Sequence, residues 1–260
     1  MVRQGVAIIA EMVSDLAGQN VMAASGPIPR GTLAGLERGQ TAFGPTFAAL
    51  VDKLANLLAF DQAELARIHL RQAPVELSLD LRVLAQTLGV ENGRWQPHHL
   101  PVLEDYLPAG KPLALYGRAP TWLYAYLGLL AAPAPVWLFD ARLGWVEAPT
   151  LVARPTGVGP ATHLYFEQST DAHHTLLTGI TNAQYLDIAE ADGIRLPILD
   201  PNRGVILSGK LPNWLWTAVS RYYAPHHPWI AAYYPPLAGA VTITSKQAER
   251  PVGTVVSQKQ

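Results

Sequence analysis

Two segments of the chain carry a glycine, a basic residue, a proline and a tryptophan in the same order behind a strand-like run. The first is Leu-Ala-Leu-Tyr-Gly-Arg-Ala-Pro-Thr-Trp-Leu-Tyr at residues 113–124, and the second is Val-Ile-Leu-Ser-Gly-Lys-Leu-Pro-Asn-Trp-Leu-Trp at residues 205–216. A glycine lets the backbone turn sharply after a strand, and a proline favours the first turn of a helix. The free amides and positive dipole end of such a helix suit a phosphate, and the basic residue adds charge. The pattern therefore predicts a cradle for a phosphodiester.

The candidate cradle residues are of the same kind in both segments. They are Gly117, Arg118, Pro120 and Trp122 in the first segment and Ser208, Gly209, Lys210, Pro212 and Trp214 in the second. An ordinary strand, turn and helix with a buried tryptophan explains the same pattern. Tryptophans at such positions also anchor a core more often than they stack on a base. The residues alone leave both interpretations open.

The two segments belong to a longer internal repeat. Gly117 and Gly209 are 92 residues apart, and each segment continues into an amphipathic helix and a second strand. Trp137 and Trp229 stand at matching positions of these strands, and the spacing is 94 residues by Phe139 and Tyr233, so a two-residue indel lies between the blocks. Self-similarity of this kind indicates tandem duplication of one structural unit.

The repeat predicts a multi-domain protein. We expect an all-α helix-turn-helix domain at residues 1–72, followed by two small α/β (α+β) modules at residues 73–153 and 154–260. The linker between the modules is expected at residues 149–160, which contain three prolines and two glycines.

The N-terminal domain contains a pattern that is typical of a helix-turn-helix. Residues 18–26 and 29–39 would form its two helices, with Gly26 in the turn and Gly39 at the final C-cap. The second helix would then read DNA with three side chains. These are Arg30, Thr32 and Arg38.

This stretch resembles the phage-repressor (Cro/repressor or Xre-like) helix-turn-helix family through Pro-Arg-Gly-Thr-Leu-Ala-Gly-Leu-Glu-Arg-Gly at residues 29–39. The resemblance implies that a homodimer binds double-stranded DNA. Residues 1–72 hold six basic and six acidic side chains, whereas DNA-binding domains usually concentrate positive charge. A helical domain for dimerisation or protein binding is therefore the alternative.

Residues 162–256 resemble the CRISPR-associated ring nuclease family of the Csx-three type. The resemblance lies in residues 204–215, 226–233, 239–241 and Ser245. Residues 75–150 resemble the same family more weakly, through residues 117–124 and 139–144. The resemblance implies a protein that binds cyclic tetra-adenylate, the messenger made by type III CRISPR complexes, and cleaves it as a manganese-dependent phosphodiesterase.

The family's catalytic motif, as the resemblance implies it, has a His before the second strand, an Asp and an Arg after that strand, and a final His. His226 matches the first position in the second module, whereas Tyr234, Pro236 and Lys246 replace the others. Asp140 and Arg142 match the Asp and the Arg in the first module, but Ala132 stands at the position of the His. We therefore expect binding without cleavage. A composite catalytic site of His226, Asp140 and Arg142 remains the alternative, and manganese is expected only in that case.

The sequence lacks the motifs that mark several other kinds of enzyme and metal site. The chain has no cysteine, a net charge of −1, and no HExxH, P-loop or Gly-x-Ser-x-Gly motif. We expect no resident metal or cofactor and a cytoplasmic location. Residues 121–139 form an uncharged run long enough to cross a bilayer, but a helix followed by a buried strand explains it better, because Pro133 and Pro135 interrupt it.

These patterns together predict a transcriptional regulator that senses a cyclic oligoadenylate through its paired modules. The first alternative is a ring nuclease with a composite site. The second is a structural or toxin–antitoxin-type repressor whose modules only dimerise.

Overall fold

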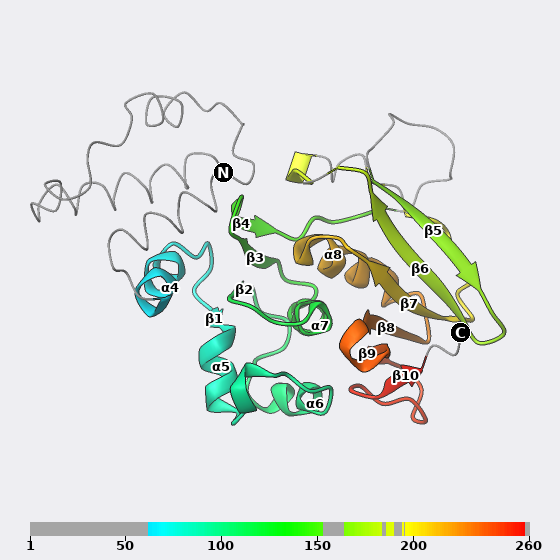
Figure 1. The fold of residues 1–260 in the computed structure, drawn as a ribbon, viewed down its shortest axis with the longest axis horizontal. Helices are drawn as coiled ribbons and strands as arrows, with labels where there is room; N and C mark the ends of the chain where they lie inside the picture. Colours follow the sequence, from blue (N-terminus) through cyan, green and yellow to red (C-terminus); the bar gives the residue numbers. More distant parts are fainter. Residues whose placement is uncertain (1–61, 153–163, 184–185, 190–193, 195, 258–260) are drawn as a thin grey trace, which may run out of the picture. The chain divides into compact units, whose positions relative to one another are not determined.

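The computed structural model describes residues 62–152, 164–183, 186–189, 194 and 196–257 (Figure 1). The predicted helix-turn-helix, with Arg30, Thr32 and Arg38, lies outside these residues. The chain divides into two compact units, of which one combines residues 1–73 with 139–146 and the other combines residues 74–138 with 147–260.

The described part of the first unit packs around a buried histidine. Helix α4 (Gln62–Arg71) carries His69, whose ring stacks on Phe139 with 4.2 Å between the centroids. Trp145 Nε1 donates a hydrogen bond of 3.0 Å to the backbone carbonyl of His69. Burial lowers the pKa of His69 from 6.5 to about 4, so the imidazole is neutral in the folded protein.

A four-stranded sheet runs in the order β1-β2-β3-β4, and β2 pairs in parallel with both β1 and β3. Its strands are β1 (Ser78–Asp80), β2 (Leu113–Tyr116), β3 (Val136–Asp140) and β4 (Gly144–Glu147). The helices around it are α5 (Leu81–Thr87), η2 (Glu91–Gly93), α6 (His99–Val102), η3 (Leu103–Asp105) and α7 (Thr121–Ala131).

A six-stranded sheet runs in the order β10-β9-β8-β7-β6-β5, and its three central strands β6, β7 and β8 are parallel. Its strands are β5 (Leu164–Thr170), β6 (His174–Thr181), β7 (Gly204–Gly209), β8 (Trp229–Tyr234), β9 (Gly239–Ser245) and β10 (Val255–Ser257). Helix α8 (Asn213–Tyr223) connects β7 to β8, and η5 (Pro235–Leu237) follows β8. Ile206, Trp229, Ala231 and Ala240 form one buried cluster of this sheet.

The units β2-α7-β3 and β7-α8-β8 have the same strand register. Leu113 pairs with Val136 as Val205 pairs with Ile230, and each of the next two pairs follows in step. The spacing between the units is therefore 92 residues in the first strand and already 94 in the second. This corrects the prediction that Trp137 matches Trp229, because the spacing is already 94 residues where the second strand begins.

Helices α7 and α8 pack against each other in parallel, beside one another between β2 and β7 (Figure 1). Thr121 Oγ1, at the start of α7, donates a hydrogen bond of 3.1 Å to Oδ1 of Asn213, at the start of α8. At the other end, Arg221 Nη2 donates to the carbonyl of Ala134, just beyond α7, at 2.9 Å. The starts of the two helices are therefore in contact with each other, and so are their ends. The helices run in the same direction, and their N-termini meet.

The middle of the α7–α8 contact depends on a residue without a side chain. A Cβ on Gly128 would overlap Cγ2 of Thr217, so the two helix backbones approach closely at this point. Almost all of α7 is buried, from Trp122 to Gly128. Among the described residues no helix has the length and apolar character needed to cross a bilayer, and residues 121–139 form α7 and β3, which confirms the predicted helix and strand.

Candidate functional site

The two candidate cradles begin at glycines with the same backbone conformation. Gly117 and Gly209 both have a φ of 112°, a region that side chains disfavour. A Cβ on Gly209 would also overlap the carbonyl oxygen of Gly179 on β6. The predicted sharp turn after each strand is therefore present in both places.

Each glycine carbonyl accepts a hydrogen bond from an aromatic side chain seven residues further along. Trp216 Nε1 donates to the carbonyl of Gly209 at 3.4 Å, and the hydroxyl of Tyr124 donates to the carbonyl of Gly117. Burial raises the pKa of Tyr124, so this hydroxyl keeps its proton. These matching bonds hold each turn against the helix that follows it.

The helices start one residue after the prolines. Pro120 and Pro212 are the N-caps of α7 and α8, and neither helix has a side-chain cap or an acidic residue in its first turn. No side chain therefore caps the first-turn amides, although those of Leu123 and Leu215 donate to the carbonyls of Pro120 and Pro212 at 3.0 Å. Because the N-termini of two parallel helices meet here, two positive dipole ends lie close together, which favours an anion.

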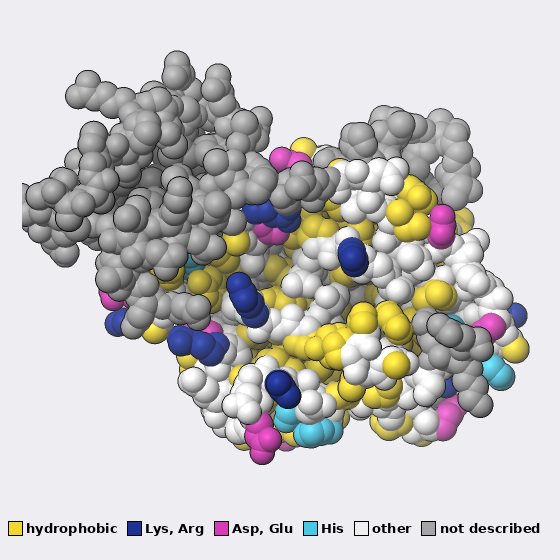
Figure 2. All heavy atoms as spheres, in the orientation of Figure 1, with side chains coloured by type: hydrophobic (Ala, Val, Ile, Leu, Met, Phe, Trp, Pro, Cys, Tyr) yellow, Lys and Arg dark blue, Asp and Glu magenta, His cyan; other side chains and the backbone are white. Residues whose placement is uncertain are grey.

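The basic residues of both cradles are exposed. Arg118 and Lys210 follow Gly117 and Gly209 directly, and neither forms an ion pair with an acidic residue in the described part of the chain. Figure 2 shows Lys and Arg side chains spread singly over the visible face, with hydrophobic side chains between them. Both charges are therefore available to a ligand.

The cradle tryptophans lie in the core. Trp122 and Trp214 are fully buried, and the Nε1 of each has no hydrogen-bond partner among the described residues. The ring of Trp122 contacts that of Tyr234 edge to face, at 6.3 Å between centroids. This burial favours the interpretation of both tryptophans as core anchors over that of base-stacking platforms.

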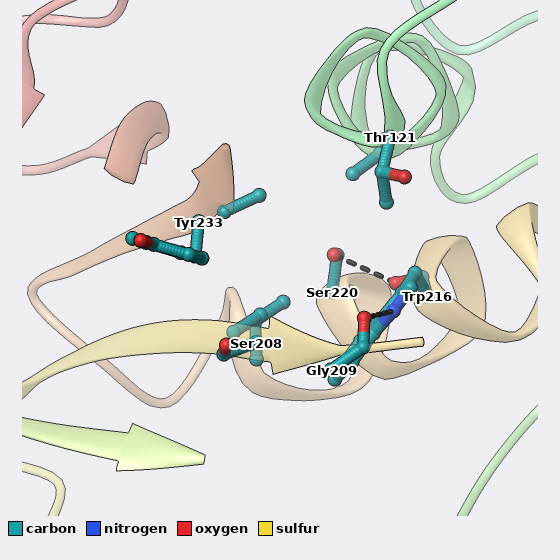
Figure 3. Close-up of a pocket in the computed structure, with 9 residues that line it drawn as sticks. Thr121, Ser208, Gly209, Trp216, Ser220 and Tyr233 are labelled. Carbon is teal, nitrogen blue, oxygen red and sulfur yellow. Dashed lines mark hydrogen bonds between the residues drawn. The ribbon is translucent and has the colours of Figure 1, made fainter. Parts of the chain in front are cut away.

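A small pocket of about 30 Å³ opens beside Gly209 (Figure 3). Figure 3 shows Thr121 and Ser220 on its helical side and Ser208 and Tyr233 on its strand side. It is further lined by Ala125 of α7, Trp216 of α8, Leu207 and Gly209 of β7, and Ala232 of β8. Sequence reasoning identified Ser208 and Gly209 but missed the others, which come from separate elements without a shared motif.

None of the candidate catalytic residues lines this pocket. His226 is exposed and follows the C-terminus of α8, about 16 Å along the helix from the turn at Lys210. It also precedes β8, whereas Tyr234 ends that strand, so the two residues lie at opposite ends of β8. Lys246, at the position of the family's final His, donates to the carbonyl of Pro225 at 2.8 Å.

Asp140 and Arg142 neutralise each other at the end of β3. Arg142 Nη2 lies 3.3 Å from Asp140 Oδ2, and the backbone amide of Arg142 donates to Asp140 Oδ1 at 2.8 Å. This pairing ties both side chains to one turn. Within the described residues, no three histidine or acidic side chains are arranged so that they could hold a metal ion.

His227, which directly follows His226 in the chain, has a structural role. Its side chain is buried, and its Nδ1 is 2.9 Å from the carbonyl of Arg203. Burial lowers the pKa of His227, with a smaller contribution from the charge of His226. The adjacent pair therefore divides into one buried and one exposed imidazole.

Comparison with protein families identifies part of this architecture. Residues 180–257 match the family described as CRISPR-associated protein (Cas_csx3). The C-terminal part of the chain carries a Cas_csx3 domain. This domain contains β7 to β10, α8 and the cradle around Gly209, and it points to a CRISPR-associated role. No curated protein matches the chain.

Proposed function

We propose that this protein is a CRISPR-associated regulator that binds a cyclic oligoadenylate, of which cyclic tetra-adenylate is the expected form, where the N-termini of α7 and α8 meet. The observation that carries the proposal is the meeting of these two uncapped helix N-termini beside the exposed side chains of Arg118 and Lys210. The Cas_csx3 domain supports a nucleotide messenger as the anion.

The matched geometry of the two cradles supports a ligand with repeated units. We infer that residues 73–153 and 154–260 are divergent copies of one module, of which only the second retains a recognisable Cas_csx3 match. The shared register, the equal φ of Gly117 and Gly209 and the matching aromatic hydrogen bonds support this inference. A ring of identical nucleotides offers equivalent phosphates to two such cradles.

Binding without cleavage is the form of the proposal that the side chains favour. A phosphodiesterase needs a group to move protons or to hold a metal near the phosphate. His226 lies beyond the far end of α8, and Tyr234 and Pro236 stand at the end of β8 and just after it, where the resemblance implies an Asp and an Arg. The cradle therefore keeps its basic residues. None of the second module's residues at the family's catalytic positions places a catalytic group beside it.

The regulatory half of the proposal concerns the N-terminal domain. A homodimer would bind double-stranded DNA through Arg30, Thr32 and Arg38, with two recognition helices on a palindromic site. The ligand would control this binding only if it prefers one of two arrangements of the recognition helices.

Removal of the two cradle charges tests the ligand site. We expect Arg118→Ala with Lys210→Ala to weaken binding of cyclic tetra-adenylate by about a hundredfold, since two charge-assisted contacts are lost. Binding by the wild type should also weaken as salt is raised. Lys111→Ala is the matched control, because Lys111 is exposed but precedes β2, whereas Arg118 follows it. Equal losses in both variants would exclude the cradle.

A ring nuclease is the second candidate, favoured by the exposure of His226 and by the Cas_csx3 domain. Incubation of the full chain with cyclic tetra-adenylate and manganese, followed by chromatography, distinguishes the two. Linear products that disappear in His226→Ala, but persist in a variant of the exposed His98, would identify an enzyme. Recovery of the intact ring would support the sensor.

A further inference from the structure

The pocket beside Gly209 is lined by hydroxyl groups and by no charged side chain. Ser220 Oγ donates to the carbonyl of Trp216 at 2.8 Å, which leaves its lone pairs free to accept. The hydroxyl of Ser208 has no hydrogen-bond partner in the described part of the chain. A neutral site of this kind suits a group that both donates and accepts, as a hydroxyl does, rather than a phosphate.

The size of the pocket restricts its occupant. A cavity volume of about 30 Å³ has room for one or two water-sized groups and is too small for an adenine base. The pocket nevertheless adjoins the cradle, since Thr121 lines it and also hydrogen-bonds Asn213 where the two helices start. A nucleotide phosphate at the helix N-termini would therefore bring its own ribose to the mouth of the pocket.

Around β2, α8 and β3, three of the positions that match the pocket lining carry larger side chains. Tyr116 stands 92 residues before Ser208, and Leu138 stands 94 residues before Ala232. Thr217 stands 92 residues after Ala125, and its methyl group occupies the space beside Gly128. Gly128 stands 92 residues before Ser220, so the matching set also lacks two of the serine hydroxyls, those of Ser208 and Ser220.

We propose that the pocket formed by Thr121, Ser208, Ser220 and Tyr233 binds one ribose 2′-hydroxyl of the ligand and so distinguishes ribonucleotide rings from deoxyribonucleotide rings. This inference rests on the proposed function, because it requires that a cyclic oligonucleotide binds at the α7–α8 N-termini. The 2′-hydroxyl is the group by which a protein distinguishes RNA from DNA at a given position. Because the two halves differ, only one ribose of the ring is read in this way.

The test compares cyclic tetra-adenylate with the same ring built from 2′-deoxyadenosine, titrated into the full chain. We expect the deoxyribose ring to bind about tenfold more weakly, since one buried hydroxyl contact is lost. A ring with a single deoxyribose should bind almost as well as the ribose ring, because it can turn and present another ribose. Equal affinity of the ribose ring and the all-deoxyribose ring would overturn the inference and leave the proposed function standing. Failure of both to bind would overturn both.

Two variants assign the preference to this pocket. Ser208→Ala should lose most of the preference for ribose, whereas Tyr116→Phe, at the matching position of the other half, should keep it. A Ser208→Ala protein that keeps the full preference would overturn the assignment, as would loss of the preference in both variants. Retention of the thermal unfolding midpoint shows that each variant is folded.

Discussion

His69 illustrates how burial lowers the pKa of a side chain in this protein. Its ring is stacked on Phe139, and the surrounding apolar groups lower its pKa to about 4. In the unfolded chain a histidine takes up a proton near pH 6.5. The folded state therefore binds fewer protons than the unfolded state between these two values, and lowering the pH through this window favours unfolding.

This difference predicts a pH dependence of stability. His69 contributes its full stability above pH 6.5 and loses it as the pH falls to about 4, at a cost of up to about 3 kcal/mol. His69→Phe should remove this part of the pH dependence, as measured by urea unfolding at pH 7 and pH 4.5. His98→Phe is the control, because His98 is exposed. If the free energy of unfolding of His69→Phe still falls between pH 7 and pH 4.5 as much as that of the wild type, the prediction is wrong.

At the scale of elements, the helix pair depends on close contact between α7 and α8. Gly128 has no side chain where Thr217 approaches, and Thr217 is itself fully buried. Glycine is normally unfavourable in the middle of a helix by about 1 kcal/mol relative to alanine. Its presence here is explained by the space that Thr217 requires.

The contact between Gly128 and Thr217 predicts the sign of the coupling energy in a double-mutant cycle. Gly128→Ala should lower the free energy of unfolding by about 2 kcal/mol, since overpacking outweighs the gain in helix propensity. Thr217→Ala in the same chain should restore most of this loss, because it removes the methyl group that the new Cβ at position 128 would meet. Denaturant unfolding of the wild type, both single variants and the double variant measures the coupling. Additive effects would show that the two residues do not constrain each other.

The strand-turn-helix units were predictable from sequence because their signals are local. A glycine, a basic residue and a proline within four positions specified both turns, and the helices start within one residue of the expected position. The match of Trp137 with Trp229 was wrong, since a tryptophan occurs near the start of each second strand and only the strand register shows that the two are not equivalent.

The pocket was not predictable for the opposite reason. Thr121, Ser208, Ser220 and Tyr233 come from four elements, and no sequence spacing relates them. Serine and threonine are common at the surface, so their types gave no signal until the two helices brought them together.

At the scale of the whole molecule, one chain supplies both halves of the proposed ligand site. In a homodimer of single modules two chains would be needed to bring two helix N-termini together, whereas here α7 and α8 do so within one chain. The proposed homodimer then serves DNA binding by residues 1–72 rather than the ligand site. Each chain of such a dimer should therefore bind its own ring.

Calorimetric titration of the full chain with cyclic tetra-adenylate, with chromatography of the recovered ligand, tests the central claim most directly. We predict one ring bound per chain, recovered intact in the presence of manganese, and binding that is severely weakened in the Arg118→Ala and Lys210→Ala double variant. Absence of binding, or one ring shared by two chains, would contradict the site at the α7–α8 N-termini.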